Sequence, residues 1–326
     1  MKSTEFLAQL IKSWEKVNNL RKEEKNKPVE IKAFNEFWFT IDNNNYPGLR
    51  IKLDQNSKFQ TKNIPKAKGW GIFTGKNLIE MHLSNKNHIE FFIKIVNLII
   101  TKIFIEKISG DKSIECFFEN LISAKDFFED ENIPKKLTPE SQIGLFGEIF
   151  VLSKILNKKL SNKNSLLSWT GPSKKHDFTT NKILIETKTT VTESKIVNTS
   201  STNQIAPVFE KELFLFFLQL KKNSAGLSLN EIINVFSEIL KNESDLLYNE
   251  FLLKLVQSKY FEIHKKEYNE KYMVDKINYY EVRDDFPYIK KINVPDAISD
   301  LSITYKIDLE KCVNFKINEE KVLEKL

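Results

Sequence analysis

The stretch that most constrains the fold is a short hairpin pattern, HDFTTNKILIETKTT, over residues 176–190. It predicts two antiparallel strands, residues 178–180 and 183–185, joined by a two-residue Asn-Lys turn. Continuing that pairing by one position places Asp177 directly opposite Glu186. Opposed residues of an antiparallel pair hold their Cβ atoms roughly 5 Å apart. Two carboxylates at that separation repel each other unless a cation lies between them.

A lysine completes this group. Lys188 projects from the same strand face as Glu186, because strand side chains alternate. The preceding residues, 183–185, are apolar on both faces, which is typical of a buried central strand where unpaired charges are expensive. Two acids and a lysine at one strand end therefore predict a hydrolytic metal site. The alternative is an ordinary solvated strand face, because the E-x-K tripeptide is common in lysine-rich chains.

Further motifs share the order and spacing of one protein superfamily. They are a G-x-x-G-E helix (Gly144–Glu148), a W-x-G-P segment (Trp169–Pro172), an H-D-F strand (His176–Phe178), an E-x-K-T-T strand (Glu186–Thr190) and a following glutamine, Gln204. With these motifs the chain resembles the PD-(D/E)XK nuclease superfamily, which includes many restriction endonucleases, and within it an uncharacterised bacterial branch. The resemblance covers about residues 138–326. Departures are His176 in place of the usual Pro and Thr187 in place of the usual Val.

The resemblance implies an α/β fold (α+β overall), with a restriction-endonuclease-like core of a mixed central sheet flanked by helices. We expect this nuclease-like domain over 133–326, including a C-terminal strand extension. Its predicted order is helix, strand, strand, strand, helix, strand. An α+β domain is predicted over 1–132. Its role is open, with substrate recognition and partner docking as the candidates.

The resemblance also implies roles for single residues. Asp177 and Glu186, with the backbone carbonyl of Thr187, are expected to hold Mg²⁺ through oxygen ligands, and Mn²⁺ is expected to substitute. Lys188 is expected to orient or help deprotonate the attacking water and to stabilise the transition state. His176 should point to the other face of its strand, in a structural role.

Glu148 and Gln204 are the remaining candidate site residues. Glu148 falls on a predicted helix that begins after the N-cap Thr138 and is apolar nearly all round. A carboxylate buried there needs a partner, either a core Lys or Arg or the metal site itself, and the resemblance favours the metal site. Gln204 should point toward the site in the resembling branch, whereas the residue alone suggests an exposed loop. Gly144 and Gly147 are expected to let the helix approach the sheet closely.

The first part of the chain contains no recognisable chemistry. A helix is predicted near Ser3–Asn19 and others over His88–Ile105 and Ser113–Phe128, with alternating segments between them that indicate strands. Its aromatic residues in alternating runs are either core residues or, less commonly, platforms for nucleic-acid bases: Trp38, Phe39 and Trp70.

Composition narrows the function classes. The chain has 326 residues, 41% hydrophobic and 29% charged, as expected for a soluble globular protein. Cys116 and Cys312 lack metal-ligand spacing, which suits a reducing cytoplasm. No signal peptide is predicted, and lysines interrupt the longest apolar stretch, Ile89–Phe104, so no membrane association is expected. The net charge of +6 is compatible with binding a phosphate backbone. If the excess of lysine reflects the base composition of the genome, the lysines would instead be spread over the whole surface rather than gathered into a groove.

Together these features predict a Mg²⁺-dependent DNA endonuclease that acts on double-stranded DNA in bacterial restriction or phage defence. The alternative is a nuclease-fold subunit that binds DNA or assembles a defence complex and cleaves weakly or not at all. A homodimer and a defence-system protein partner are both open, since cutting two strands generally requires two sites.

Overall fold

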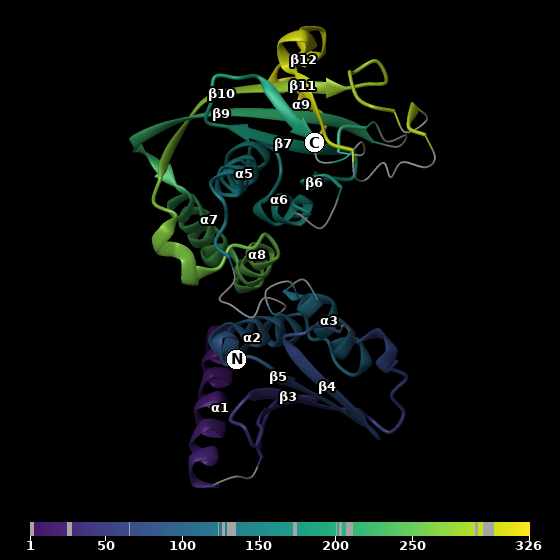
Figure 1. The fold of residues 1–326 in the computed structure, drawn as a ribbon, viewed down its shortest axis with the longest axis vertical. Coiled ribbons are helices and arrows are strands. Elements are labelled where there is room, and N and C mark those ends of the chain that lie inside the picture. The colour runs from purple at the N-terminus through teal and green to yellow at the C-terminus, as the bar shows by residue number, and fades with distance from the viewer. Residues whose placement is uncertain are drawn as a thin grey trace. The chain divides into compact units, whose positions relative to one another are not determined.

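The computed structural model divides the chain into two compact units (Figure 1). The first comprises Met1–Lys135 and Lys241–Lys259, and the second comprises Lys136–Leu240 and Tyr260–Leu326. The structure describes residues 3–24, 28–64, 66–122, 124–125, 128, 135–171, 175–199, 201, 204–206, 211–290, 293–295 and 303–326. Pro172 of the W-x-G-P segment lies outside these residues. The chain thus contributes to the first unit twice.

An antiparallel five-stranded sheet, in the order β1-β2-β3-β5-β4, forms the centre of the first unit. Its strands are β1 Val29–Phe34, β2 Phe37–Ile41, β3 Pro47–Lys52, β4 Trp70–Gly75 and β5 Leu78–Leu83. The register aligns Phe39 with Leu49 and Leu49 with Met81, and all three side chains are buried. The sheet therefore has one apolar face, as the alternating sequence predicts.

Helices among the described residues of this unit include α1 Ser3–Glu23, α2 Ile89–Ile105, α3 Asp111–Ile122 and α8 Asp245–Gln257. Helix α8 follows most of the second unit's sheet in sequence, yet it packs on α2. Asn249 of α8 donates a hydrogen bond to the carbonyl of Leu98 at 3.0 Å, and Glu250 forms an ion pair with Lys102 at 2.7 Å. These contacts make α8 a structural part of the first unit.

The aromatic residues of the first unit mostly build its core. Phe39 and Trp70 are buried, and Phe39 stacks on Trp14 with ring centroids 3.9 Å apart. The core interpretation is therefore correct for Phe39 and Trp70, and the base-stacking alternative is wrong for them. Trp38 lies on the opposite sheet face with the Lys52 ammonium 3.5 Å from its ring centre.

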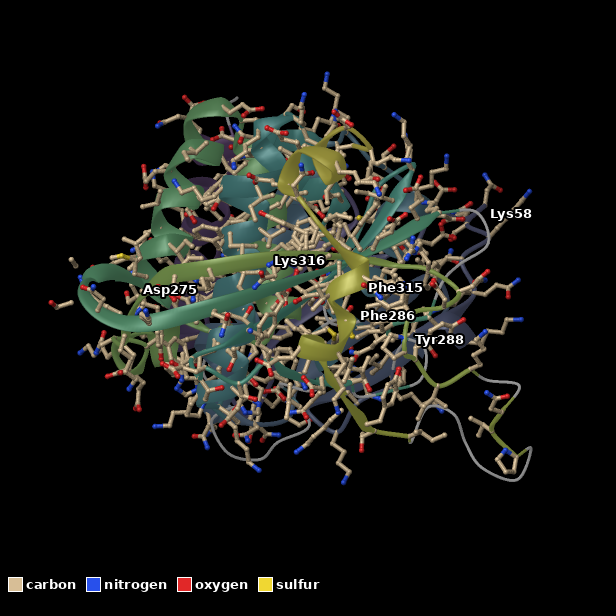
Figure 2. The ribbon with its side chains drawn as sticks, turned by 90° about the horizontal axis from the view of Figure 1, so that it is seen from above. Lys58, Asp275, Phe286, Tyr288, Phe315 and Lys316 are labelled. Atoms are coloured by element: carbon tan, nitrogen blue, oxygen red, sulfur yellow. The ribbon has the colours of Figure 1, made fainter. Side chains whose placement is uncertain are left out.

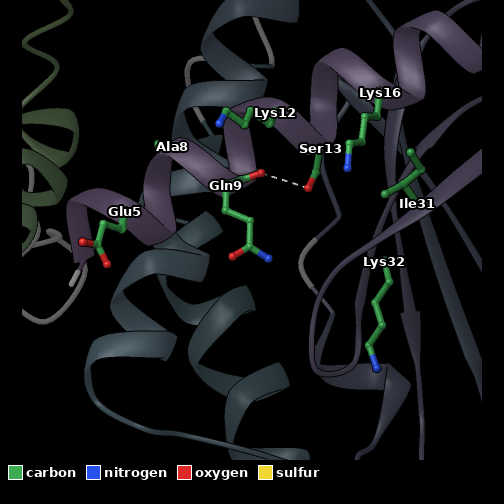
Figure 3. Close-up of a pocket in the computed structure, with 8 residues that line it drawn as sticks. All are labelled: Glu5, Ala8, Gln9, Lys12, Ser13, Lys16, Ile31 and Lys32. Atoms are coloured by element: carbon green, nitrogen blue, oxygen red, sulfur yellow. Dashed lines mark hydrogen bonds between the residues drawn. The ribbon is translucent and has the colours of Figure 1, made fainter. Parts of the chain in front are cut away.

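A surface pocket lies between α1 and β1 (Figure 3). It is lined by Glu5, Ala8, Gln9, Lys12, Ser13, Lys16, Ile31 and Lys32. Lys12, Lys16 and Lys32 form no ion pair with any residue that the structure describes. We call this feature the lysine pocket. Its three lysines give it a net positive charge, since Glu5 is its one acidic lining residue.

The second unit contains a mixed five-stranded sheet in the order β12-β10-β9-β7-β6. Its strands are β6 Phe178–Thr179, β7 Ile183–Thr190, β9 Glu212–Ser228, β10 Lys271–Val282 and β12 Lys316–Ile317. Strands β7 and β9 are parallel, and the other neighbours are antiparallel. A separate two-stranded ribbon pairs β8 Ile196–Thr199 with β11 Tyr305–Asp308.

The helices of this unit are α5 Pro139–Phe150, α6 Asn162–Ser168, α7 Leu229–Glu243 and α9 Glu319–Leu323. The elements α5, β6, β7, β9, α7 and β10 follow the predicted order of helix, strand, strand, strand, helix, strand. The observed fold is thus the predicted one of helices and mixed sheet. Helix α5 is followed directly by a π-helical turn over Val151–Ile155.

Helix α5 packs closely on β7 at Gly147. A Cβ added to Gly147 would lie 1.9 Å from Thr189 Oγ1 and 3.0 Å from Thr189 Cβ. Glycine is therefore required for this approach. The same expectation for Gly144 is wrong, because a Cβ there would meet nothing within 4 Å. The two positions are three residues apart, about 300° around the helix axis, and of the two Gly147 is the one in contact with β7.

An apolar cluster covers the opposite face of β7 and β9. Its buried members include Leu184, Leu215, Phe217 and Ile307, with Tyr305 packed at its margin. Figure 2 shows Phe286, Tyr288 and Phe315 grouped together, while Asp275 lies at the far end of the sheet. Along β7 side chains alternate, so the face of Leu184 is also the face of Glu186 and Lys188. The predicted site residues therefore lie beside the C-terminal segments.

Local sequence signals account for the helix starts. Thr138 caps α5 by accepting a hydrogen bond from the Ser141 N–H at 3.2 Å, with Pro139 at the first helical position. Ser228 and Glu231 form the predicted capping box of α7, with reciprocal bonds of 3.2 and 2.7 Å. Strand β9 is longer than the predicted Leu213–Leu220. Its second half is exposed and polar, so hydrophobic patterning does not reveal it.

Candidate active site

The hairpin that leads into the site has the predicted register. Phe178 pairs with Ile185 and Thr179 with Leu184, and the Thr180 N–H donates to the Ile183 carbonyl at 2.9 Å to close the two-residue turn. Strand β6 begins at Phe178, so Asp177 lies just before the ladder, where β7 continues without this partner.

Asp177 is held by backbone groups on two sides. The Thr187 N–H donates to Asp177 Oδ2 at 2.7 Å, and the Thr170 N–H donates to the Asp177 carbonyl at 2.9 Å. Gly171, next to Thr170, has a φ of +68°, a conformation that favours glycine. The W-x-G segment thus fixes the strand end from which Asp177 projects.

Glu186 and Lys188 form a buried ion pair on the same face of β7. The Lys188 Nζ lies 2.8 Å from Glu186 Oε1, and it also donates to Gln204 Oε1 at 3.2 Å. Glu186 is only 2% exposed. In the parallel register Glu186 lies beside Leu215 and Lys188 beside Phe217, so apolar neighbours surround both charges. A solvated strand face is thereby excluded.

Glu148 reaches the same site from α5. Its Oε2 accepts a hydrogen bond from the Trp169 indole N–H at 2.8 Å. The charges of Asp177, Glu186 and Lys188 all act on it. The nearest partner of this carboxylate is thus a neutral indole rather than the core Lys or Arg of the alternative interpretation.

The pKa values of the three acids are raised because they are buried close together. Burial raises the pKa of Glu186 to about 8, and the charge of Asp177 adds to this effect. Burial likewise raises the pKa of Asp177 to about 6 and that of Glu148 well above its usual range. Burial lowers the pKa of Lys188, but the ion pair with Glu186 and the charges of Asp177 and Glu148 together outweigh it, so the net direction is upward. Perturbed pKa values of this kind are typical of functional sites.

The donor set fits a hard divalent cation in its chemistry, although the side chains do not converge on one point. Among the described residues, no group of three or more His, Cys, Asp or Glu is placed to hold a metal ion. Each acid is instead engaged by another group: Asp177 by the Thr187 amide, Glu148 by Trp169, and Glu186 by Lys188. All the available donors are oxygens, which Mg²⁺ and Mn²⁺ prefer.

His176 is a buried neighbour of the site. Burial lowers the pKa of its imidazole to about 4, with Lys175 as a second cause, so the ring is neutral at neutral pH. A neutral buried ring suits the structural role expected from its position beside Asp177.

Two residues of the site were not assigned roles from the sequence. Trp169 belongs to the W-x-G-P motif, but only the structure shows its indole bonded to Glu148. Tyr305 packs at the margin of the apolar cluster with its hydroxyl buried, and the charge of Lys188 contributes to the pKa of that hydroxyl. It lies far from β7 in sequence, so no local pattern could reveal the contact.

Comparisons with known proteins identify a family for this chain. No described helix has both the length and the apolar character needed to cross a membrane. No match was found among curated proteins or among solved structures. One family model matches residues 10–310, which is most of the chain, under the description "Putative PD-(D/E)XK family member, (DUF4420)". The site described above lies within the matched range, and the chain belongs to this family.

Proposed function

We propose that this protein is a divalent-metal-dependent nuclease that hydrolyses phosphodiester bonds in DNA. The observation that carries the proposal is the burial of Asp177, Glu186, Lys188 and Glu148 close enough for their charges to act on one another, although they come from the residue before β6, from β7 and from α5. Membership of a nuclease-related family supports the same reaction class. Charges kept together at such a cost in solvation favour a functional role over a structural one.

The proposed ligands are the carboxylates of Asp177, Glu186 and Glu148 and the carbonyl of Thr187. In a strand, the N–H and C=O of one residue point to the same side. The Thr187 carbonyl therefore faces the side on which its N–H meets Asp177. A divalent ion bound there, Mg²⁺ with Mn²⁺ as a substitute, would make a water molecule more acidic and neutralise phosphate charge.

The chain's own residues supply orientation and charge. The Lys188 ammonium has three N–H donors, and Glu186 and Gln204 accept from two of them. The third is available to the attacking water or to the phosphate, whose charge grows in the transition state. Gln204 holds the ammonium from a loop, and the Trp169 indole holds Glu148.

The test is cleavage of supercoiled plasmid and linear DNA with Mg²⁺ or Mn²⁺, with EDTA as the blank. Asp177→Asn and Lys188→Ala should abolish cleavage, and Lys182→Ala, in the exposed turn of the same hairpin, should not. Equal cleavage by all variants would exclude the assigned site. Binding without cleavage, even with Mn²⁺, would favour the second candidate, a DNA-binding or assembly subunit.

The first unit is proposed to contact the DNA backbone. The lysine pocket supports this, because three lysines without ion pairs suit an array of phosphates. A role in restriction or phage defence extends the proposal, on the resemblance to restriction endonucleases. Protection of bacteria from phage by the wild type, and not by Asp177→Asn, would test it. Size measurements with and without DNA would show whether cleavage involves a homodimer.

A further inference from the structure

The Lys188 ammonium supplies positive charge beside the three acids Asp177, Glu186 and Glu148. The ammonium is 2.8 Å from Glu186 Oε1. Asp177 and Glu148 also act on it through their charges. Of the described residues, Lys188 is the one cation that affects all three acids. When all three acids are ionised, one ammonium leaves two negative charges unbalanced, and one divalent ion would balance them.

The ion pair also explains why the acids do not converge. Glu186 Oε1 is engaged by Lys188, and the described residues show no group ready to hold a metal. A divalent ion that uses Glu186 must therefore take this carboxylate from Lys188. The ammonium also donates a hydrogen bond to Gln204 Oε1 at 3.2 Å. The Gln204 amide is neutral, so it does not repel the carboxylates that would bind the ion.

We propose that Lys188 is the resident cation of the metal-free site, and that a divalent ion and Lys188 compete for Glu186. This rests on the proposed metal site. Binding of the ion frees the ammonium from Glu186, and Gln204 keeps it beside the site, available to the substrate phosphate. Gln204 is then a positioning residue that acts through Lys188. The exchange would keep the lysine away from the phosphate until the site is loaded.

The experiment is isothermal titration of the metal-stripped full chain with Ca²⁺ and with Mn²⁺, without DNA. We compare the wild type with Lys188→Met and with Lys188→Gln, a polar variant that retains a hydrogen-bonding side chain if the methionine variant folds poorly. Lys182→Met is the matched control, because it removes one positive charge from the same hairpin without touching the acids. Circular dichroism confirms folding of each variant.

If the lysine is a competitor, both Lys188 variants should bind the ions about 10- to 100-fold more tightly, since one competing charge has been removed. Lys182→Met should stay within about twofold of the wild type. Unchanged or weaker binding by the Lys188 variants would overturn the exchange while leaving the metal site intact. No binding by any protein would refute the metal site and the exchange together.

The variant Gln204→Leu removes the hydrogen bond from Lys188 to Gln204 without changing any proposed metal ligand. It should leave Ca²⁺ affinity within about twofold of the wild type, because Gln204 is not needed to hold the ion. Cleavage with Mn²⁺ should fall through kcat rather than KM, as expected for a group that orients Lys188 in the transition state. Loss of Ca²⁺ affinity in this variant, or an unchanged kcat, would contradict the role given to Gln204.

Discussion

Replacing Gly147 by alanine should destabilise the second unit, whereas the same change at Gly144 should stabilise it. Both residues lie inside α5, where alanine is favoured over glycine by about 0.5–1 kcal/mol. At Gly144 nothing opposes that gain, because a new Cβ meets no atom within 4 Å. At Gly147 the Cβ would overlap Thr189 Oγ1 at 1.9 Å and press on its Cβ and Cγ2 at 3.0 and 3.2 Å.

The hydroxyl can rotate away, but Thr189 Cβ is fixed to β7 and cannot move without the strand. Overpacking of this kind costs about 1–3 kcal/mol. After the helix-propensity gain is subtracted, we expect a net loss of about 0.5–2 kcal/mol for Gly147→Ala and a gain of about 0.5–1 kcal/mol for Gly144→Ala. The two variants differ in sign although the substitution is identical.

Urea unfolding followed by circular dichroism would measure both effects as shifts in the midpoint at constant slope. The double variant Gly147→Ala, Thr189→Gly supplies the decisive control, since removing the whole Thr189 side chain, Cβ included, should recover much of the loss. An interaction energy near zero in this double-mutant cycle would show that the clash with Thr189 is not the cause. A stabilised Gly147→Ala would refute the close packing of α5 on β7.

Three further predictions concern the charges of the molecule. Because the folded-state pKa of Glu186 is raised to about 8, the metal-free protein should lose stability as pH rises from about 4.5 to 8. The affinity for Ca²⁺ should rise over the same pH range, because the carboxyl group ionises. In urea titrations, Glu186→Gln should flatten the dependence of stability on pH. Trp169→Phe should cost about 1–3 kcal/mol in urea unfolding, because Glu148 loses its indole donor. Replacing the three lysines of the lysine pocket by alanine should lower the slope of log Kd against log salt for DNA by about 2–3, measured by fluorescence anisotropy; an unchanged slope would remove the pocket from the DNA contact.

The part of the site that lies within one hairpin could be predicted from the sequence. The opposition of Asp177 and Glu186 follows from the turn length, and the shared face of Glu186 and Lys188 follows from strand alternation. Both are local rules that need no knowledge of the rest of the chain. The helix starts at Thr138 and Ser228 are equally local, because capping depends on neighbouring side chains.

Contacts between distant segments could not be predicted in this way. The indole bond from Trp169 to Glu148 and the placement of Tyr305 depend on how separate elements pack. The difference between Gly144 and Gly147 depends on the rotation of α5 about its axis, which an almost uniformly apolar helix does not encode. Engagement of Glu186 by Lys188 was likewise not expected, since the sequence interpretation assigned both residues to their roles in the loaded site.

The placement of α8 has a consequence for the order in which the protein can be made. The first unit needs Asp245–Gln257, whose buried Leu247 and Phe251 complete its core, so it cannot finish folding until the ribosome has translated past β9. A fragment ending at residue 135 would leave the α8-binding surface of α2 open to solvent and prone to aggregation. The chain passes between the two units three times, after Lys135, Leu240 and Lys259, so three cuts rather than one are needed to separate them.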